Sequence, residues 1–144
     1  MKNAMKVEFV NNTTPKVIEC CNKYASNGNE IIHDDNNINL EDGWIIHVEA
    51  NAYKGVRYFA GYSSIHTHGL KKYGLRNLEA AAKGKRQIKR ITELMKIVGS
   101  QMIEHGELEA YREYCYSING TDIKFMVVTD LCVDGLGWSL ILKD

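Results

Sequence analysis

The sequence predicts an α+β domain in which a mainly antiparallel sheet of about five strands packs against an N-terminal helix and a long central helix. Three observations predict this class: apolar residues at helical spacing over 75–105, alternating apolar and polar residues over 44–50, and Asn119-Gly120 between two β-rich runs. A chain of 144 residues is long enough for one core, so we expect a single domain over 1–144.

The N-terminal helix is predicted over 14–28, and a polar loop is expected after it, over 29–42. Thr14 is a suitable N-cap, and Pro15 suits the first helical position because its missing N–H has no partner there. Gly28 is placed to end the helix. The apolar stripe at helical spacing consists of Val17, Ile18, Cys21, Tyr24 and Ala25.

Two strands are predicted next, at 44–50 and at 56–65. Side chains of the first strand alternate between the two sides of a sheet, with Trp44, Ile46 and Val48 on one side and Ile45, His47 and Glu49 on the other. The second strand is rich in Tyr and Phe. Its Ala60-Gly61 step marks either a bulge or a close approach of a ligand or another backbone, and the bulge is favoured.

The long central helix is predicted over 75–105, with its basic residues in the N-terminal half. Its apolar positions are Leu78, Ala82, Ile88, Ile91, Met95, Val98 and Met102. Gly84 is a candidate interruption, and Gly106 is placed to cap the helix. Gly99 lies inside the pattern, which indicates a close helix–helix contact such as a dimer interface.

The C-terminal third is predicted to form a three-stranded meander. Runs at 108–118 and 121–131 flank the Asn119-Gly120 turn, and a turn at Asp134-Gly135 leads into a last strand at 138–143. If residues 108–118 alternate regularly as a strand, Arg112 lies on a face whose other side chains are mostly apolar. A guanidinium there needs either a carboxylate partner or a ligand phosphate, and both readings stay open.

The charge of the chain is strongly asymmetric, although 18 basic and 18 acidic residues give a formal net charge of zero. Between positions 54 and 96 there are eleven Lys or Arg and only two Glu, and the rest of the chain is correspondingly acidic. Such a segment can attract phosphates or an acidic partner. The simpler alternative is a solvated helix face, matched to the acidic half of a neighbouring subunit.

Metal binding and catalysis are weakly indicated. His66 and His68 would point to the same side of an extended segment, but a zinc site needs at least a third protein ligand, and no H-E-x-x-H motif supplies one. Ser63-Ser64 lies near His66 without any recognised nucleophile motif. The four cysteines form no C-x-x-C pair and are read as reduced. We therefore predict no metal, no cofactor and no catalytic residues.

An anion site is better supported, at residues 69–77 where the chain enters the predicted long helix. Free N–H groups at a helix start, together with Lys71, Lys72 and Arg76, favour a phosphate, although a solvated basic face is the alternative. Aromatic rings such as Phe59 and Tyr62 are near in sequence and suit base stacking or core packing. No Walker or dinucleotide-binding glycine motif is present.

The chain resembles the phage Thoeris anti-defence "sponge" proteins. The resemblance rests on Glu41-Asp42-Gly43-Trp44, on Tyr53-Lys54-Gly55-Val56-Arg57-Tyr58 with Ala60-Gly61-Tyr62, on the long basic helix, and on the closing Gly137-Trp138-Ser139-Leu140. It implies a non-enzymatic homo-oligomer, a dimer or larger, that sequesters cyclic ADP-ribose isomers, and in some members cyclic oligonucleotides, at a subunit interface. Arg, Asn and aromatic side chains would line that pocket.

The predicted function is therefore to bind a nucleotide-derived immune signal without degrading it, inside an infected bacterial cell. Neither a membrane nor a nucleic-acid polymer is expected as a partner, and the N-terminus lacks the apolar core of a signal peptide. Two alternatives stay open: an anti-CRISPR-like inhibitor that binds a nucleic-acid-guided nuclease, and a small nucleotide-processing enzyme. The predicted ligand-binding residues are Arg57, Phe59, Tyr62, Lys72, Arg76, Asn77, Arg90 and Arg112.

Overall fold

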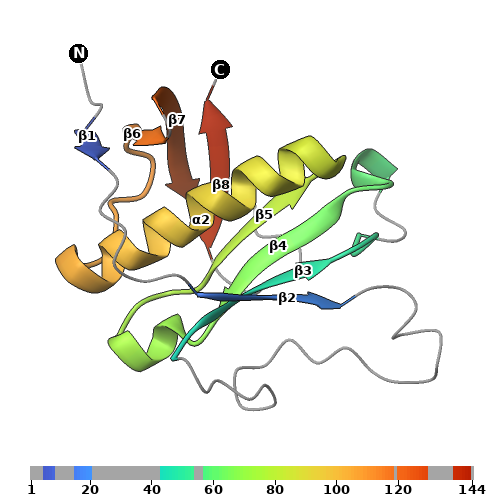
Figure 1. Ribbon diagram of the computed structural model, residues 1–144, viewed down its shortest axis with the longest axis horizontal. Helices are drawn as coiled ribbons and strands as arrows, with labels where there is room; N and C mark the ends of the chain where they lie inside the picture. The colour runs from blue at the N-terminus through green and yellow to red at the C-terminus, as the bar shows by residue number, and fades with distance from the viewer. Residues whose placement is uncertain are drawn as a thin grey trace.

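The computed structural model describes residues 5–8, 15–20, 43–53, 57–118, 120–129 and 138–143. These residues form one mixed eight-stranded sheet, in the order β1-β6-β7-β8-β5-β4-β3-β2, and α2 crosses one face of it (Figure 1). Within the described ranges, no helix combines the length and apolar character that crossing a membrane requires.

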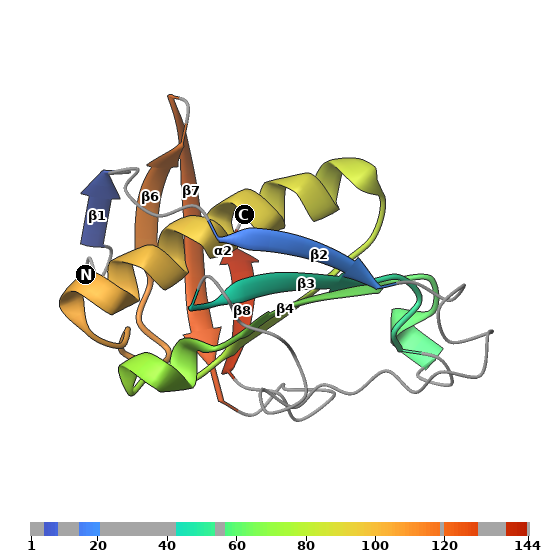
Figure 2. The ribbon, with the colours of Figure 1, turned by 60° about the horizontal axis from the view of Figure 1, so that its bottom comes forward.

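The first half of the sheet is built from β2 (Lys16–Cys20), β3 (Ile45–Glu49), β4 (Ser63–His68) and β5 (Leu78–Ala82). β2 pairs with β3 in parallel, whereas β3, β4 and β5 pair antiparallel. Between these strands lie two short 3-10 helices, η2 (Arg57–Phe59) and η3 (Leu70–Tyr73), at opposite ends of β4 (Figure 2).

The second half contains β6 (Tyr114–Ile118), β7 (Thr121–Val128), β8 (Trp138–Lys143) and the edge strand β1 (Met5–Glu8). The antiparallel β6–β7 pairing, in which Ile118 faces Thr121, confirms the predicted hairpin; Asn119 itself lies outside the described residues. The two halves join through a short parallel pairing in which Leu78 faces Trp138 and Glu79 faces Ser139. The turn predicted at 134–135 and the loop predicted at 29–42 lie outside the described residues.

The hydrophobic core lies between α2 (Lys85–His105) and the face of the sheet that the helix covers. Ile46, Ile65, Phe125 and Val127 come from this face and are completely buried. Because side chains alternate along a strand, the residues between them point to the other face of the sheet. This alternation confirms the two sides predicted for the strand at 44–50.

Three glycines mark the start, the interior and the end of α2. Gly84 precedes α2 with a φ of 87°, which explains why the helical pattern is interrupted there. Gly99 lies where a methyl group would overlap the indole of Trp44, so this residue, which directly precedes β3, fills the space next to the glycine. The close helix–helix contact predicted at Gly99 is replaced by this helix-to-sheet contact. Gly106 ends α2 as predicted, its N–H donating to the carbonyl of Met102 over 2.8 Å.

The predicted fold class is wrong in three respects. Residues 16–20 form β2 instead of an N-terminal helix. An apolar run this short fits both the helical period of 3.6 residues and the strand period of 2 residues, and here the run pairs with β3. Residues 78–82 form β5, although the central helix was predicted from 75; pairing with β4 and β8 overrides the helix propensity of its alanines. The sheet is mixed and has more strands than predicted, because β1, β2 and β5 each make a parallel pairing.

The strand predicted at 56–65 is displaced. Arg57–Phe59 is the 3-10 helix η2, and Gly61 has a φ of 80°, so the chain turns where the bulge was expected. Pairing starts at Ser63 and continues to His68, through the segment predicted to be a linker. The strand predicted at 108–118 begins only at Tyr114.

Candidate functional site

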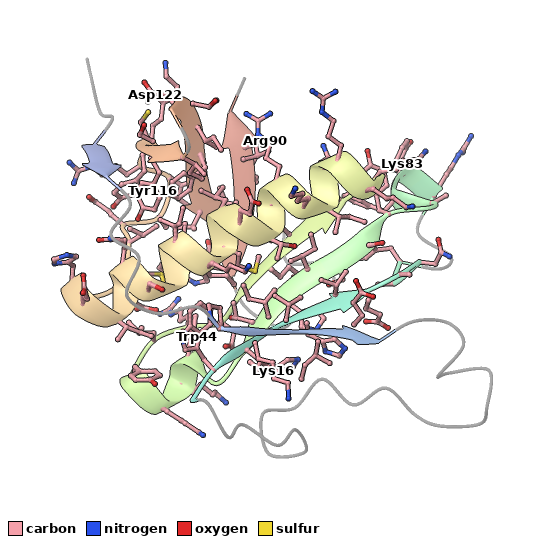
Figure 3. The ribbon with its side chains drawn as sticks, viewed as in Figure 1. Lys16, Trp44, Lys83, Arg90, Tyr116 and Asp122 are labelled. Atoms are coloured by element: carbon pink, nitrogen blue, oxygen red, sulfur yellow. The ribbon has the colours of Figure 1, made fainter. Side chains whose placement is uncertain are left out.

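A basic groove runs between the N-terminal half of α2 and the ends of β6, β7 and β8. It has a volume of about 610 Å³, and we define it by its lining: Lys83, Arg86, Gln87, Lys89, Arg90, Glu93, Ile118, Thr121, Ile123 and Leu142. Four cations and one carboxylate therefore surround an apolar floor, since Ile118 and Ile123 belong to the core. Figure 3 labels Arg90 on the N-terminal half of α2 and Lys83 next to the start of the helix.

The start of α2 adds to the positive potential of the basic groove. The first turn of the helix contains no acidic residue, and its N-cap is a glycine without a side chain to accept a hydrogen bond. Unpaired N–H groups at a helix start carry partial positive charge, so an anion is favoured there. The Gln87 side chain folds back toward this end and accepts a hydrogen bond from the N–H of Lys83 over 2.7 Å.

Of the eight residues predicted to bind a ligand, only Arg90 lines the basic groove. Arg57 is exposed on η2. Phe59 and Tyr62 are half-buried, their ring centroids 5.5 Å apart, and the Lys83 ammonium lies 5.8 Å from the centroid of the Tyr62 ring. These aromatic rings lie at the same end of α2 as the groove but outside its lining.

Lys72, Arg76 and Asn77 lie at the other end of β4 and β5. Lys72 is exposed on η3, and Arg76 lies 4.4 Å from the Trp138 ring centroid and 3.9 Å from a Glu107 carboxylate oxygen. The Asn77 side-chain oxygen accepts hydrogen bonds from the Thr67 hydroxyl and from the N–H of Leu70, at 3.0 and 3.3 Å. These bonds hold the β4–β5 connection in place.

Arg112 lies before β6, and not on the inward face of a strand. Its guanidinium is 3.4 Å from a Glu109 carboxylate oxygen and 5.6 Å from the ring centroid of Tyr114. The carboxylate partner considered from the sequence is therefore present, at Glu109. The predicted alternation failed here because Tyr111, with a φ of 65°, turns the chain before β6 begins.

A second candidate site is a buried histidine cluster, His47, His66 and His68, on the face of the sheet opposite α2. His47 on β3 lies directly across from His66 on β4, and all three side chains are at most 4% exposed. One ring nitrogen from each histidine can be chosen so that all three atoms lie within 4.8 Å of one another. His47 Nδ1 and His68 Nε2 are 3.4 Å apart.

Two other buried polar residues, Ser64 and Glu79, lie on the same face of the sheet as the histidine cluster. The Ser64 hydroxyl lies 2.8 Å from Nδ1 of His66. Glu79 on β5 pairs with His66 across the sheet and accepts a hydrogen bond from the Tyr53 hydroxyl over 3.3 Å. A cavity of about 320 Å³ begins beside Glu79, where β5 and β8 diverge, and Tyr53 and Ser139 also line it.

The sequence signal for the histidine cluster was present but was assigned to the wrong element. Strand alternation placed His47 opposite Trp44 and Ile46, and His66-Thr67-His68 has the spacing of one strand face. Because residues 66–68 were predicted to be a linker, no argument brought His47 beside them. The third imidazole, His47, comes from the neighbouring strand β3.

Comparisons of the chain with protein-family models, with curated proteins and with solved structures return no match. Both candidate sites are therefore judged on their own geometry and chemistry.

Proposed function

We propose that the protein binds a phosphate-bearing nucleotide signal in the basic groove and holds it without turnover. The observation that carries this proposal is the lining of the groove, in which Lys83, Arg86, Lys89 and Arg90 surround one cavity with a single opposing carboxylate. Arginine presents paired N–H donors that match phosphate oxygens, and lysine adds a mobile positive charge.

The size and floor of the basic groove support a small ligand. Pockets of roughly 300–1,000 Å³ suit small molecules and cofactors, and the groove falls within that range. Ile118, Ile123 and Leu142 offer an apolar surface against which a base or sugar could pack. The described lining contains neither a histidine nor a cysteine, so binding without turnover is the simpler proposal. A cyclic ADP-ribose isomer is the first ligand to test, in keeping with the family resemblance.

The experiment is calorimetry with a panel of cyclic ADP-ribose isomers and cyclic oligonucleotides, followed by denaturation and chromatography of the released ligand. We expect one ligand to bind and to be recovered intact. Affinity that falls steeply between low and physiological salt would instead favour a broad charged interface with a macromolecule. Binding of no panel member, or recovery of a cleaved product, would refute the proposal.

A pair of charge-reversed variants locates the site. Arg86→Glu with Arg90→Glu reverses two cations of the groove, and we expect at least a tenfold loss of affinity. Lys71→Glu with Lys72→Glu makes the same change in charge on η3, outside the groove, and should bind as the wild type does. The opposite pattern would move the anion site to the segment at 69–77.

A further inference from the structure

We propose that His47, His66 and His68 form a binding site for a divalent transition-metal ion, with zinc as the probe. The proposal goes beyond the ligand-binding function, because the histidine cluster lies on the face of the sheet opposite the basic groove. It rests on the pairing of β3 with β4, which places three imidazoles from two strands side by side.

The spacing of the ring nitrogens fits one ion. Two nitrogens bound to the same tetrahedral zinc at roughly 2.0–2.1 Å are about 3.3–3.4 Å apart. His47 Nδ1 and His68 Nε2 are already separated by 3.4 Å. The longest separation in the cluster is 4.8 Å, so a modest side-chain rotation of the third ring would complete the set.

Ser64 supplies the support that a metal-binding histidine requires. Such a histidine usually has its other ring nitrogen hydrogen-bonded, which fixes the tautomer and the orientation of the ring. The Ser64 hydroxyl lies 2.8 Å from His66 Nδ1 and accepts the N–H in one of the two tautomers. Nε2 of His66 then carries the lone pair that a metal ion takes.

Burial explains why an ion would be favoured over three neighbouring imidazoles alone. The ring centroids are 4.8, 4.9 and 5.5 Å apart, and the side chains are 4%, 0% and 1% exposed for His47, His66 and His68. Neutral imidazole is the form that binds a metal, and the bound ion satisfies the lone pairs of the rings together.

The ligand set also indicates the class of metal. Imidazole suits zinc, copper, nickel and iron better than magnesium or calcium, which prefer oxygen ligands. Three histidines leave a fourth tetrahedral position for water or an exchangeable ligand. The nearest carboxylate in the pairing pattern is Glu79, which lies across from His66 and borders the 320 Å³ cavity. It is placed to offset part of the ion's charge.

The first test measures zinc binding by the full chain after removal of metal with a chelator. Competition with a chromophoric chelator should give one zinc per chain, and zinc should raise the melting temperature. Cobalt in place of zinc should give the visible spectrum of a nitrogen-ligated tetrahedral ion. Absence of tight zinc binding, or a thiolate-to-cobalt absorption band that places the ion on cysteines, would overturn the proposal.

Variants then identify the ligands. His68→Gln keeps a polar side chain of similar size and should lower zinc affinity by more than tenfold, while the melting temperature no longer responds to zinc. Ser64→Ala should weaken binding by roughly 10–100-fold, as loss of a partner behind a ligand usually does. His105→Ala removes an exposed histidine of α2 and should bind zinc normally.

The variants also separate metal binding from a purely structural role. A hydrogen-bonded histidine cluster without metal predicts that His68→Gln lowers the melting temperature equally with and without zinc, and that outcome would refute the proposal. Zinc affinity that falls in His105→Ala but not in His68→Gln would refute it as well. If His68→Gln does not fold, the cobalt spectrum and stoichiometry of the wild-type chain decide the question.

Discussion

The two faces of the sheet are both buried near its centre, but they are built from different chemistry. The face under α2 is apolar, with Ile46, Ile65 and Phe125 at its centre. The opposite face carries His66, Glu79 and their neighbours at a similar degree of burial. Burying an apolar side chain stabilises the fold directly, whereas a buried polar group requires a compensating partner. The first face therefore accounts for most of the stability, with the basic groove at its margin, whereas the second face holds the histidine cluster.

Tyr116, an ionisable residue on the apolar face, shows how burial there keeps a side chain uncharged. Burial raises the pKa of the Tyr116 phenol well above its usual value, and the neighbouring Tyr114 adds to the rise. Tyr116 therefore stays neutral over the physiological range, and the core beneath α2 gains no charge from it.

The largest expected effect comes from the apolar face. Phe125 is fully buried and contacts the rings of Tyr114 and Tyr116, with centroid distances of 5.8 and 4.9 Å. Phe125→Ala should lower the free energy of unfolding by about 3–5 kcal/mol, because it leaves a cavity. Chemical denaturation measures this loss. Met126→Ala, at the adjacent position on the other face, should cost less, and an equal cost would remove the distinction between the faces.

The next largest loss of stability is expected for Gly99→Ala. A methyl group at this position overlaps the Trp44 indole, and overpacking of this kind costs roughly 1–3 kcal/mol of unfolding free energy. The same substitution in a Trp44→Leu background should be neutral or stabilising, because alanine favours a helix by about 1 kcal/mol over glycine. A double-mutant cycle by thermal or urea unfolding tests the coupling. Equal costs in both backgrounds would exclude the contact as the cause.

On the polar face, Tyr53→Phe should have a smaller effect. It removes the hydrogen bond from the Tyr53 hydroxyl to Glu79, which corresponds to about 1 kcal/mol of unfolding free energy. Tyr58→Phe is the control, because that side chain is 84% exposed and should change stability very little. If both variants unfold at the same urea concentration as the wild type, the Tyr53–Glu79 hydrogen bond does not contribute to stability.

The smallest effect on stability is expected for Arg90→Ala in the basic groove. Arg90 is exposed on α2, so the free energy of unfolding should change by less than about 0.5 kcal/mol. Affinity for the nucleotide ligand should nevertheless fall, which calorimetry on the folded variant can show. A large loss of stability would instead assign Arg90 a role in packing.

The sequence by itself determined the elements whose signals are local. The hairpin signal at Asn119-Gly120, the alternation over 45–49 and the helical apolar pattern after Gly84 each depend on neighbouring residues, and the structure contains the hairpin, the strand and the helix that they predict. The concentration of positive charge between positions 54 and 96 is likewise a property of the chain. The sequence placed the anion site at residues 69–77, whereas the basic groove is lined from residues 83–93, and no local pattern showed that these meet the ends of β6, β7 and β8.

Tertiary structure decided the elements whose identity depends on distant partners. Residues 78–82 favour a helix locally but form a strand because β4 and β8 offer hydrogen bonds on both sides. Residues 16–20 become a strand by pairing with β3. The histidine cluster arises in the same way, because the register of β3 against β4 brings His47 across from His66. Register is a long-range property, so no local pattern could place these three imidazoles together.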